Sequence, residues 1–337
     1  MNNAERFCQA VRVLSPRLSE LFLLLSEDER KSVREIRLRK GNPVVAVTEN
    51  GIRFLHESGR LTGIFSSFAV RTGDREIDEI FHRVCSYSVY ACKDSVNRGY
   101  VTVEGGHRVG VAGTAVTENG RITAVRDVNC INLRIAREIR GAADEIFRRC
   151  YSEGFCGLIV AGPPSSGKTT VLRDLARQLS GEDRGFLAKV FVCDERGEIG
   201  AVHNGKVQND LGINCDVLTS YPKNEGILIG LRSFSPDIII CDEIATDDEA
   251  AAVESGLCSG VHFALSVHAM NKRDLCSKPI VRRLLDSGCF GNVVLLSGSN
   301  VGATAEFFTA GDLIGQIDGG DSCCIGNRSW RQTSCNE

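Results

Sequence analysis

The sequence predicts an α/β protein of two domains, in which a larger domain built on a parallel sheet follows a smaller α+β domain. Three observations support this prediction. From residue 141 on, apolar runs of about five residues alternate with helix-like segments, the pattern of parallel strands covered by helices. A segment rich in Gly, Pro and Ser separates the first run from the helix pattern after it. Before residue 140, hairpin turns separate the runs instead.

The first domain is predicted over residues 1–140. A helical pattern comes first, followed by strands at 33–39 and 43–47, and the pair Asn50-Gly51 turns the chain into a strand at 52–55. A second helix is indicated by apolar residues at i, i+3, i+4 and i+7 spacing. Short strands at 100–103 and 108–111 and a hairpin turn at Asn119-Gly120 follow. The apolar positions of the two helices are Phe7, Ala10, Val11, Leu14, Leu18, Leu21 and Phe22, then Ile77, Ile80, Phe81 and Val84.

The second domain is predicted over residues 141–317. Its strands are expected at 157–161, 189–193, 237–241, 263–267 and 293–296. Most of these are continuous apolar runs, as strands buried on both faces should be. Residues 318–337 mix Gly, Ser, Cys and Asn, so we expect a flexible tail there.

Composition limits the function classes. The chain has 337 residues with 40 basic and 43 acidic side chains, a net charge of −3. No global positive field therefore indicates nucleic acid as a partner. No apolar run reaches the roughly 18–20 residues of a membrane-spanning helix, and the N-terminus lacks the features of a secretory signal. We expect a cytoplasmic protein without a transmembrane segment of its own.

The fifteen cysteines are spread along the chain without a C-x-x-C pair, which gives a zinc site little support. Several stand inside apolar runs, where Cys acts as a small hydrophobe. We expect free thiols in a reducing compartment. The neighbours Cys323 and Cys324 are the alternative, a redox-active pair.

The segment after the first apolar run fits the phosphate-binding loop G-x-x-x-x-G-K-[ST] without a mismatch. Its glycines let successive backbone N–H groups converge on phosphate, and the helix that follows points its positive dipole end at the same anion. A chance turn is disfavoured because an apolar strand precedes the loop and an amphipathic helix follows it. We expect Lys168 to reach the β- and γ-phosphates of ATP. GTP is disfavoured because no N-K-x-D sequence is present. The predicted cofactor-binding residues are Gly162, Pro163, Pro164, Ser165, Ser166, Gly167, Lys168, Thr169 and Thr170.

Magnesium and water need further groups. Thr169 can offer its hydroxyl to Mg²⁺. The apolar run at 237–241 ends in Asp242 and Glu243, and a carboxyl end of this kind is where open parallel sheets bind ligands. We expect Asp242 to hold Mg²⁺ and Glu243 to polarise the attacking water.

Three further predictions have ordinary structural alternatives. The acids Asp194, Glu195 and Glu198 follow another apolar run, and they either approach the nucleotide or form a solvated turn in which Arg196 pairs locally. His268 ends a strand as a sensor of phosphate or as a structural histidine. Arg232 is either aimed at phosphate or caps a helix end.

These residues together resemble the stage III sporulation protein AA family, which is related to the ATPases of type II and type IV secretion systems. The resemblance runs from about residue 30 to 300. It rests on the loop at 161–170 and on the following segments: 107–110, 131–139, 194–199 followed by Ala201, 216–218, 222–223, 225–226, 232–237, 242–244, 260–261 and 267–268. The secretion relatives usually have Gly where Asp242 stands, and Gly197 stands where this family has Ser.

The resemblance implies a RecA-like P-loop ATPase domain of the AAA+/RecA-like superfamily, in a ring of subunits that is expected to be a hexamer. It implies that Glu243 is the catalytic carboxylate, that Glu195 or Glu198 belongs to an acidic box and that His268 belongs to a histidine box. Arg108, Arg134 and Arg137 are expected to reach a nucleotide, in the same chain or across a subunit boundary. The implied partner is a membrane channel complex between mother cell and forespore.

Two other function classes remain open at this point. One is a P-loop ATPase that acts with nucleic acid, disfavoured by the near-neutral charge and the absence of a basic face interleaved with aromatic residues. The other is a nucleotide-binding scaffold with little turnover, disfavoured because binding alone needs no carboxylate to orient water.

Overall fold

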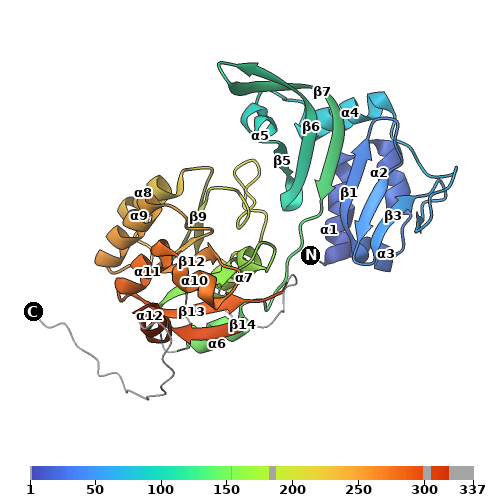
Figure 1. The fold of residues 1–337 in the computed structure, drawn as a ribbon. Coiled ribbons are helices and arrows are strands. Elements are labelled where there is room, and N and C mark those ends of the chain that lie inside the picture. The colour runs from blue at the N-terminus through green and yellow to red at the C-terminus, as the bar shows by residue number, and fades with distance from the viewer. Residues whose placement is uncertain (1, 153, 182–186, 299–304, 319–337) are drawn as a thin grey trace, which may run out of the picture.

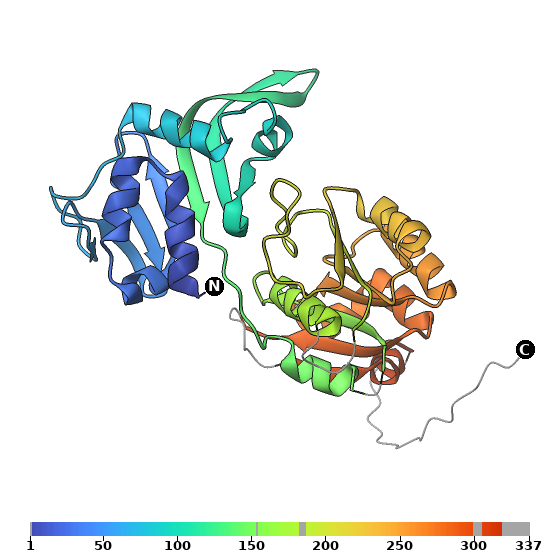
Figure 2. The ribbon, with the colours of Figure 1, turned by 180° about the vertical axis from the view of Figure 1, so that it is seen from behind.

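The computed structural model describes residues 2–152, 154–181, 187–298 and 305–318. The described chain contains two seven-stranded sheets, one formed by residues before 135 and one by residues after 156 (Figure 1). Seen from behind, the two sheets again lie apart and are joined by one extended segment (Figure 2).

The first sheet is antiparallel throughout. Its order is β4 (Leu61–Thr62), β3 (Gly51–Leu55), β2 (Val45–Thr48), β1 (Val33–Arg39), β7 (Arg121–Arg134), β6 (His107–Glu118) and β5 (Tyr100–Val103). The Asn50-Gly51 turn joins β2 to β3 as predicted. β6 and β7 extend beyond the predicted run at 108–111, because each strand pairs with the other along their length around the turn at Asn119.

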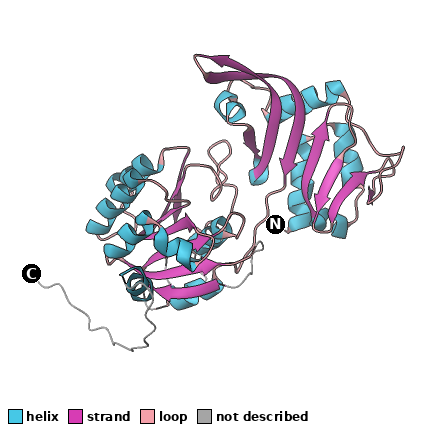
Figure 3. Cartoon of the chain, in the orientation of Figure 1, coloured by secondary structure: helices cyan, strands magenta, loops and turns pink. Residues whose placement is uncertain are grey.

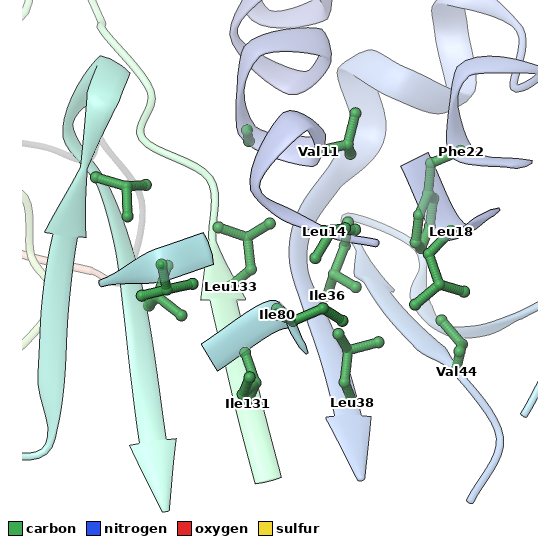
Figure 4. Packing of buried hydrophobic residues seen from close by; sticks show 14 of the residues in the cluster. Val11, Leu14, Leu18, Phe22, Ile36, Leu38, Val44, Ile80, Ile131 and Leu133 are labelled. Carbon is green, nitrogen blue, oxygen red and sulfur yellow. The ribbon is translucent and has the colours of Figure 1, made fainter. Parts of the chain in front are cut away.

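Short helices pack on this sheet. They are α1 (Asn3–Ala10), η1 (Val11–Val13), α2 (Pro16–Leu23), α3 (Glu27–Ser32), α4 (Asp74–Val84), α5 (Lys93–Asn97) and η2 (Glu104–Gly106). The first helical pattern is interrupted where Ser15 accepts a hydrogen bond from the N–H of Leu18 and Pro16 takes the first helical position. Figure 4 shows Leu14, Leu18 and Phe22 lying against the sheet near Ile36 and Val44, all fully buried.

The second sheet is parallel except for its last strand. Its order is β10 (Cys215–Thr219), β9 (Val190–Asp194), β11 (Ile238–Cys241), β12 (His262–His268), β8 (Gly157–Gly162), β13 (Phe290–Leu296) and β14 (Ala305–Thr309). The five predicted strands are all present. The edge strands β10 and β14 were missed, because both are only half buried and carry charged or polar residues in their runs.

Helices cover both faces of this sheet (Figure 3). Leu158 and Val160 pack with α6 (Asp144–Cys150) and α7 (Lys168–Ser180) on one face. Ile159 and Ala161, which alternate with them along β8, pack with α8 (Lys223–Ser233), α9 (Asp247–Cys258) and α11 (Pro279–Asp286) on the other. α10 (Lys272–Ser277) and α12 (Ala310–Asp318) complete this layer.

We propose that the two sheets are two domains that meet near residue 140, as the sequence predicts, since β7 ends at Arg134 and α6 begins at Asp144. The predicted tail lies outside the described residues from position 319 on, and so do Cys323 and Cys324. Every described cysteine is a free thiol.

Candidate functional site

The predicted phosphate loop joins β8 to α7. Its backbone turns sharply, with positive φ at Ser165 (62°) and at Gly167 (94°), the residue that precedes the helix. Gly167 has no Cβ to clash in this conformation. The first turn of α7 therefore points its free N–H groups at the hollow of the loop, the arrangement that binds anions at helix N-termini.

Lys168 is held at the centre of the loop. Its ammonium donates to the backbone carbonyls of Gly162 (2.9 Å) and Pro163 (2.8 Å), and lies 3.1 Å from Nδ1 of His268. Burial lowers the pKa of Lys168, and the nearby charges of Asp242 and Glu243 oppose that shift. The cation is thus placed where the loop's N–H groups converge.

Strand order brings the other predicted residues to the same edge. β12 lies between β8 and β11, and His268 at its end pairs with Gly162 in the strand register. Asp242 and Glu243 follow β11 directly. The carboxyl ends of these three neighbouring strands thus hold the loop, the histidine and the acid pair side by side.

Asp242 connects the loop to this acid pair. One of its carboxylate oxygens accepts a 2.6 Å hydrogen bond from the hydroxyl of Thr169, and the other accepts from the hydroxyl of Ser266. Ser266 in turn accepts from the backbone N–H of Glu243 at 2.8 Å. Ser266 lies within an apolar run, so no sequence motif indicated its role.

Glu243 has a left-handed backbone (φ 58°), and its carboxylate is held on both sides. One oxygen forms an ion pair with Arg196, and the other lies 3.2 Å from Nε2 of His268. Because the Lys168 ammonium can only donate, Nδ1 of His268 accepts and the neutral ring carries its proton on Nε2, facing Glu243. The contacted side chains form one continuous polar chain that runs from Lys168 through His268 and Glu243 to Arg196.

Lys223 was also missed as a site residue. Its side chain is only 7% exposed, and its ammonium contacts the backbone carbonyl of Glu243 and the carboxylates of Glu249 (3.0 Å) and Glu195 (3.6 Å). The sequence signal was available in the Pro222-Lys223 pair at the start of α8. Lys223 thus contacts the backbone carbonyl of Glu243, while Ser266 accepts from its backbone N–H.

The acids after β9 have separate surroundings. Asp194 is buried and accepts from the N–H groups of Glu198 (2.8 Å), Ile199 (3.2 Å) and Gly200 (2.8 Å). Burial raises the pKa of Asp194, and the three N–H donors oppose that shift. Glu195 approaches Lys223, and Glu198 pairs with Arg108 of β6 at 2.8 Å. Asp194 therefore shapes the turn. Of the three acids, Glu195 contacts Lys223, which in turn contacts the backbone of Glu243.

The three remaining predicted arginines lie elsewhere. Arg134 is exposed on β7 beside Arg108. Arg137 pairs with Glu49 at 2.8 Å and donates to the carbonyl of Lys31 at 2.6 Å. Its side chain therefore contacts the part of the chain that forms the first sheet. Arg232 is exposed in the last turn of α8, nine residues and about 13 Å of helix beyond Lys223. Within one chain, the structure does not bring Arg134, Arg137 or Arg232 to the loop.

The residues present fit a magnesium nucleotide. The hydroxyl of Ser166 is buried in the loop and has no hydrogen-bond partner among the described residues, so a polar group is missing beside it. Thr169 and Asp242 offer the hard oxygen ligands that Mg²⁺ takes alongside a phosphate. No described residues form a further cluster of His, Cys, Asp and Glu that could hold a metal by themselves.

Comparisons with known proteins agree with this arrangement. The family model for sporulation stage III, protein AA matches residues 4–307. The chain belongs to the stage III sporulation protein AA family. The stage III sporulation protein AA of Bacillus subtilis (strain 168) is 31% identical over 318 residues, which cover 94% of this chain and 99% of that protein.

Solved structures confirm the fold of this family member. The ATPase DotB of Yersinia pseudotuberculosis aligns with a TM-score of 0.52 at 16% identity, over 85% of this chain and 78% of that chain. The pilus retraction motor PilT with bound ADP aligns with a TM-score of 0.51 at 16% identity, over 78% and 74%. The predicted α/β fold of the RecA-like P-loop ATPase class is thus correct. Among the helices that the structure describes, none has the length and apolar character that a bilayer crossing requires.

Proposed function

We propose that the protein binds and hydrolyses ATP with Mg²⁺, as a motor of the secretion-ATPase type that works in sporulation. Lys168 and the loop N–H groups bind the phosphates. Thr169 and Asp242 hold the metal. Glu243 orients the attacking water, and His268 lies between the phosphate lysine and this carboxylate as the sensor.

One observation carries the proposal: the polar chain from Lys168 through His268 to Glu243, at the edge where β8, β12 and β11 end. A scaffold that only bound nucleotide would need the phosphate loop, but it would not need the Glu243 carboxylate linked to that loop through His268. The relatedness to a sporulation protein over nearly the whole chain supports the cellular process.

The partners follow from the same proposal. The protein assembles with itself as a ring, expected to be a hexamer, in the cytoplasm of the mother cell. There the ring acts on the membrane channel complex between mother cell and forespore. Light scattering with Mg²⁺ and a non-hydrolysable ATP analogue should report a hexamer-sized species. A monomer at high protein concentration would contradict the ring.

The test of hydrolysis is a comparison of wild type with Glu243→Gln. The variant keeps the shape and a donor–acceptor side chain but loses the charge that orients water. We expect unchanged binding of a fluorescent ATP analogue and a fall in turnover of about 10²- to 10⁴-fold. Unchanged turnover would show that Glu243 does not take part in hydrolysis. Added DNA or RNA should leave the rate unchanged, and a large stimulation would favour a nucleic-acid-associated ATPase.

A further inference from the structure

One residue, Arg196, joins the N-terminal sheet to the carboxylate of Glu243. Its guanidinium forms the ion pair with Glu243, while its backbone carbonyl accepts hydrogen bonds from the hydroxyl of Tyr100 (3.1 Å) and from Arg108 (3.2 Å). Tyr100 lies on β5 and Arg108 on β6. Figure 1 shows the yellow-green loops that follow β9 extending toward these two strands, and Figure 2 shows the same approach from behind.

Backbone contacts fix the base of the Arg196 turn, whereas the Arg196 side chain is largely exposed. Asp194 fastens the base through three backbone N–H groups, and Arg173 of α7 donates to the carbonyls of Glu198 (2.6 Å) and Ile199 (3.2 Å). The Arg196 side chain, in contrast, is 61% exposed. An exposed ion pair is weak and costs little to break. Arg196 can therefore leave Glu243 without unfolding the turn.

In the observed arrangement the carboxylate of Glu243 is engaged by protein groups. Both carboxylate oxygens face protein donors, Arg196 on one side and His268 on the other. A residue that orients or deprotonates water must itself be within hydrogen-bond reach of that water. We propose that Arg196 is a positioning residue that restrains Glu243 in the nucleotide-free chain, and that Tyr100 and Arg108 hold it in that place.

Arg108, which contacts this turn from the N-terminal sheet, is itself kept in place by two further contacts. The Arg108 guanidinium lies 4.3 Å from the centre of the Tyr100 ring and pairs with Glu198 at 2.8 Å. A cation over an aromatic face and an ion pair keep Arg108 in one orientation. A movement of the first sheet relative to the second would therefore pull on the carbonyl of Arg196 and release Glu243. The inference rests on the proposed hydrolysis and adds how the N-terminal sheet controls it.

The first test measures steady-state ATPase kinetics of wild type, Arg196→Gln and Arg196→Lys. We expect Arg196→Gln to raise kcat several-fold with KM unchanged, because a restraint on Glu243 is lost while the phosphate loop is intact. Arg196→Lys keeps the cation and should stay near wild type. A general structural defect would lower kcat and alter KM. A lower or unchanged kcat in Arg196→Gln overturns the proposal.

A matched control uses the same substitution at another exposed arginine, Arg126 in the β6–β7 hairpin, which forms an ion pair with its neighbour Asp127. Arg126→Gln should leave kcat at the wild-type value. Tyr100→Phe removes only the hydroxyl that holds the Arg196 carbonyl, so it should raise kcat less than Arg196→Gln does. Combined with Arg196→Gln, it should add nothing. Additive increases would show that Tyr100 acts independently of Arg196 and would overturn the link to the N-terminal sheet.

The second test does not need turnover. Melting temperatures of Arg196→Gln, Glu243→Gln and the double variant are measured without nucleotide and then with Mg²⁺ and a non-hydrolysable ATP analogue. We expect the double variant to shift less than the sum of the single shifts without nucleotide, and to become additive with it. Additive shifts without nucleotide overturn the restraint. If the shifts without nucleotide are non-additive but the wild type hydrolyses no ATP, the restraint is supported and only the proposed hydrolysis is contradicted.

Discussion

The hydroxyl of Thr169 donates a 2.6 Å hydrogen bond to the carboxylate of Asp242, joining the first turn of α7 to the end of β11. The two residues are 73 positions apart in the chain and follow strands that do not pair with each other, since β12 lies between β8 and β11. Both offer oxygen to the same small volume. This contact is the arrangement expected of the two magnesium ligands that we propose.

Replacing the acid tests this relationship. Asp242→Asn keeps the size of the side chain and can still accept from Thr169, but it loses the charge that attracts the cation. We expect nucleotide binding to need about 10- to 100-fold more Mg²⁺. A titration of Mg²⁺ against a fluorescent ATP analogue measures the change. Asp237→Asn, which precedes β11 at the opposite edge and pairs with Lys189 at 3.5 Å, is the control that should leave the titration unchanged.

The ammonium of Lys168 should decide affinity for the nucleotide. It now donates to two loop carbonyls and to His268, and a phosphate would offer it a charged acceptor instead. A hydrogen bond to a charged group is worth about 1.5–3 kcal/mol, so Lys168→Ala should weaken ATP binding by about 10- to 150-fold. Isothermal titration calorimetry measures the loss. Lys189→Ala should bind like wild type, and equal affinity in the two variants would contradict the role of the loop.

His107 should make stability depend on pH. The ring is fully buried in the first domain, where its Nδ1 accepts from the N–H of Ala136 at 3.0 Å. Burial and the charge of Arg6 lower the pKa of His107 from 6.5 to about 4. Above pH 6.5 the ring is neutral whether the chain is folded or unfolded, so its contribution is fully present there. As the pH falls from 6.5 to 4 the unfolded chain takes up the proton first, and about 3 kcal/mol of stability is lost.

The measurement is urea unfolding of wild type and His107→Asn between pH 7.5 and 4. Other groups titrate in both proteins, so the difference in slope isolates this ring. The variant should be less stable than wild type at pH 7.5 and should lose less on acidification. Parallel slopes would show that His107 does not titrate with unfolding.

Gly230 should be sensitive to a single methyl group. It lies on α8, and a Cβ at this position would stand 2.7 Å from the ring of Phe191, which is buried in β9. Overpacking costs about 1–3 kcal/mol, while Ala gains about 1 kcal/mol of helix propensity. Gly230→Ala should therefore lower stability in chemical denaturation. Gly315→Ala on α12, where no atom lies within 4 Å of the added methyl, should be at least as stable as wild type.

Much of the site was readable because its residues form local patterns. The loop at residues 162–170 and the acids after β11 are contiguous in the chain, and each follows an apolar strand. His268 was a candidate because it ends a strand, and the family resemblance assigned it to a histidine box. Ser266 was missed because nothing in the residues next to it indicates that its side chain meets the backbone of Glu243. Lys223 lies in a segment that carries the family resemblance, but that segment alone does not indicate which residues its ammonium contacts. Arg232 shows the converse, since proximity in sequence to β11 placed it near the acids while the helix direction carries it to the other edge of the sheet.

The sequence by itself determined which stretches are buried strands, where the phosphate loop lies and which acids follow a strand, because these depend on local spacing and chemistry. Only the tertiary structure decided which of these segments meet. Placing β12 between β8 and β11 puts His268 between Lys168 and Glu243. The turn after β9 brings the backbone carbonyl of Arg196 to Tyr100 and Arg108 of the first sheet. The physical reason is that such contacts join residues between 25 and 100 positions apart, and strand order and side-chain packing, rather than local propensity, set their distances.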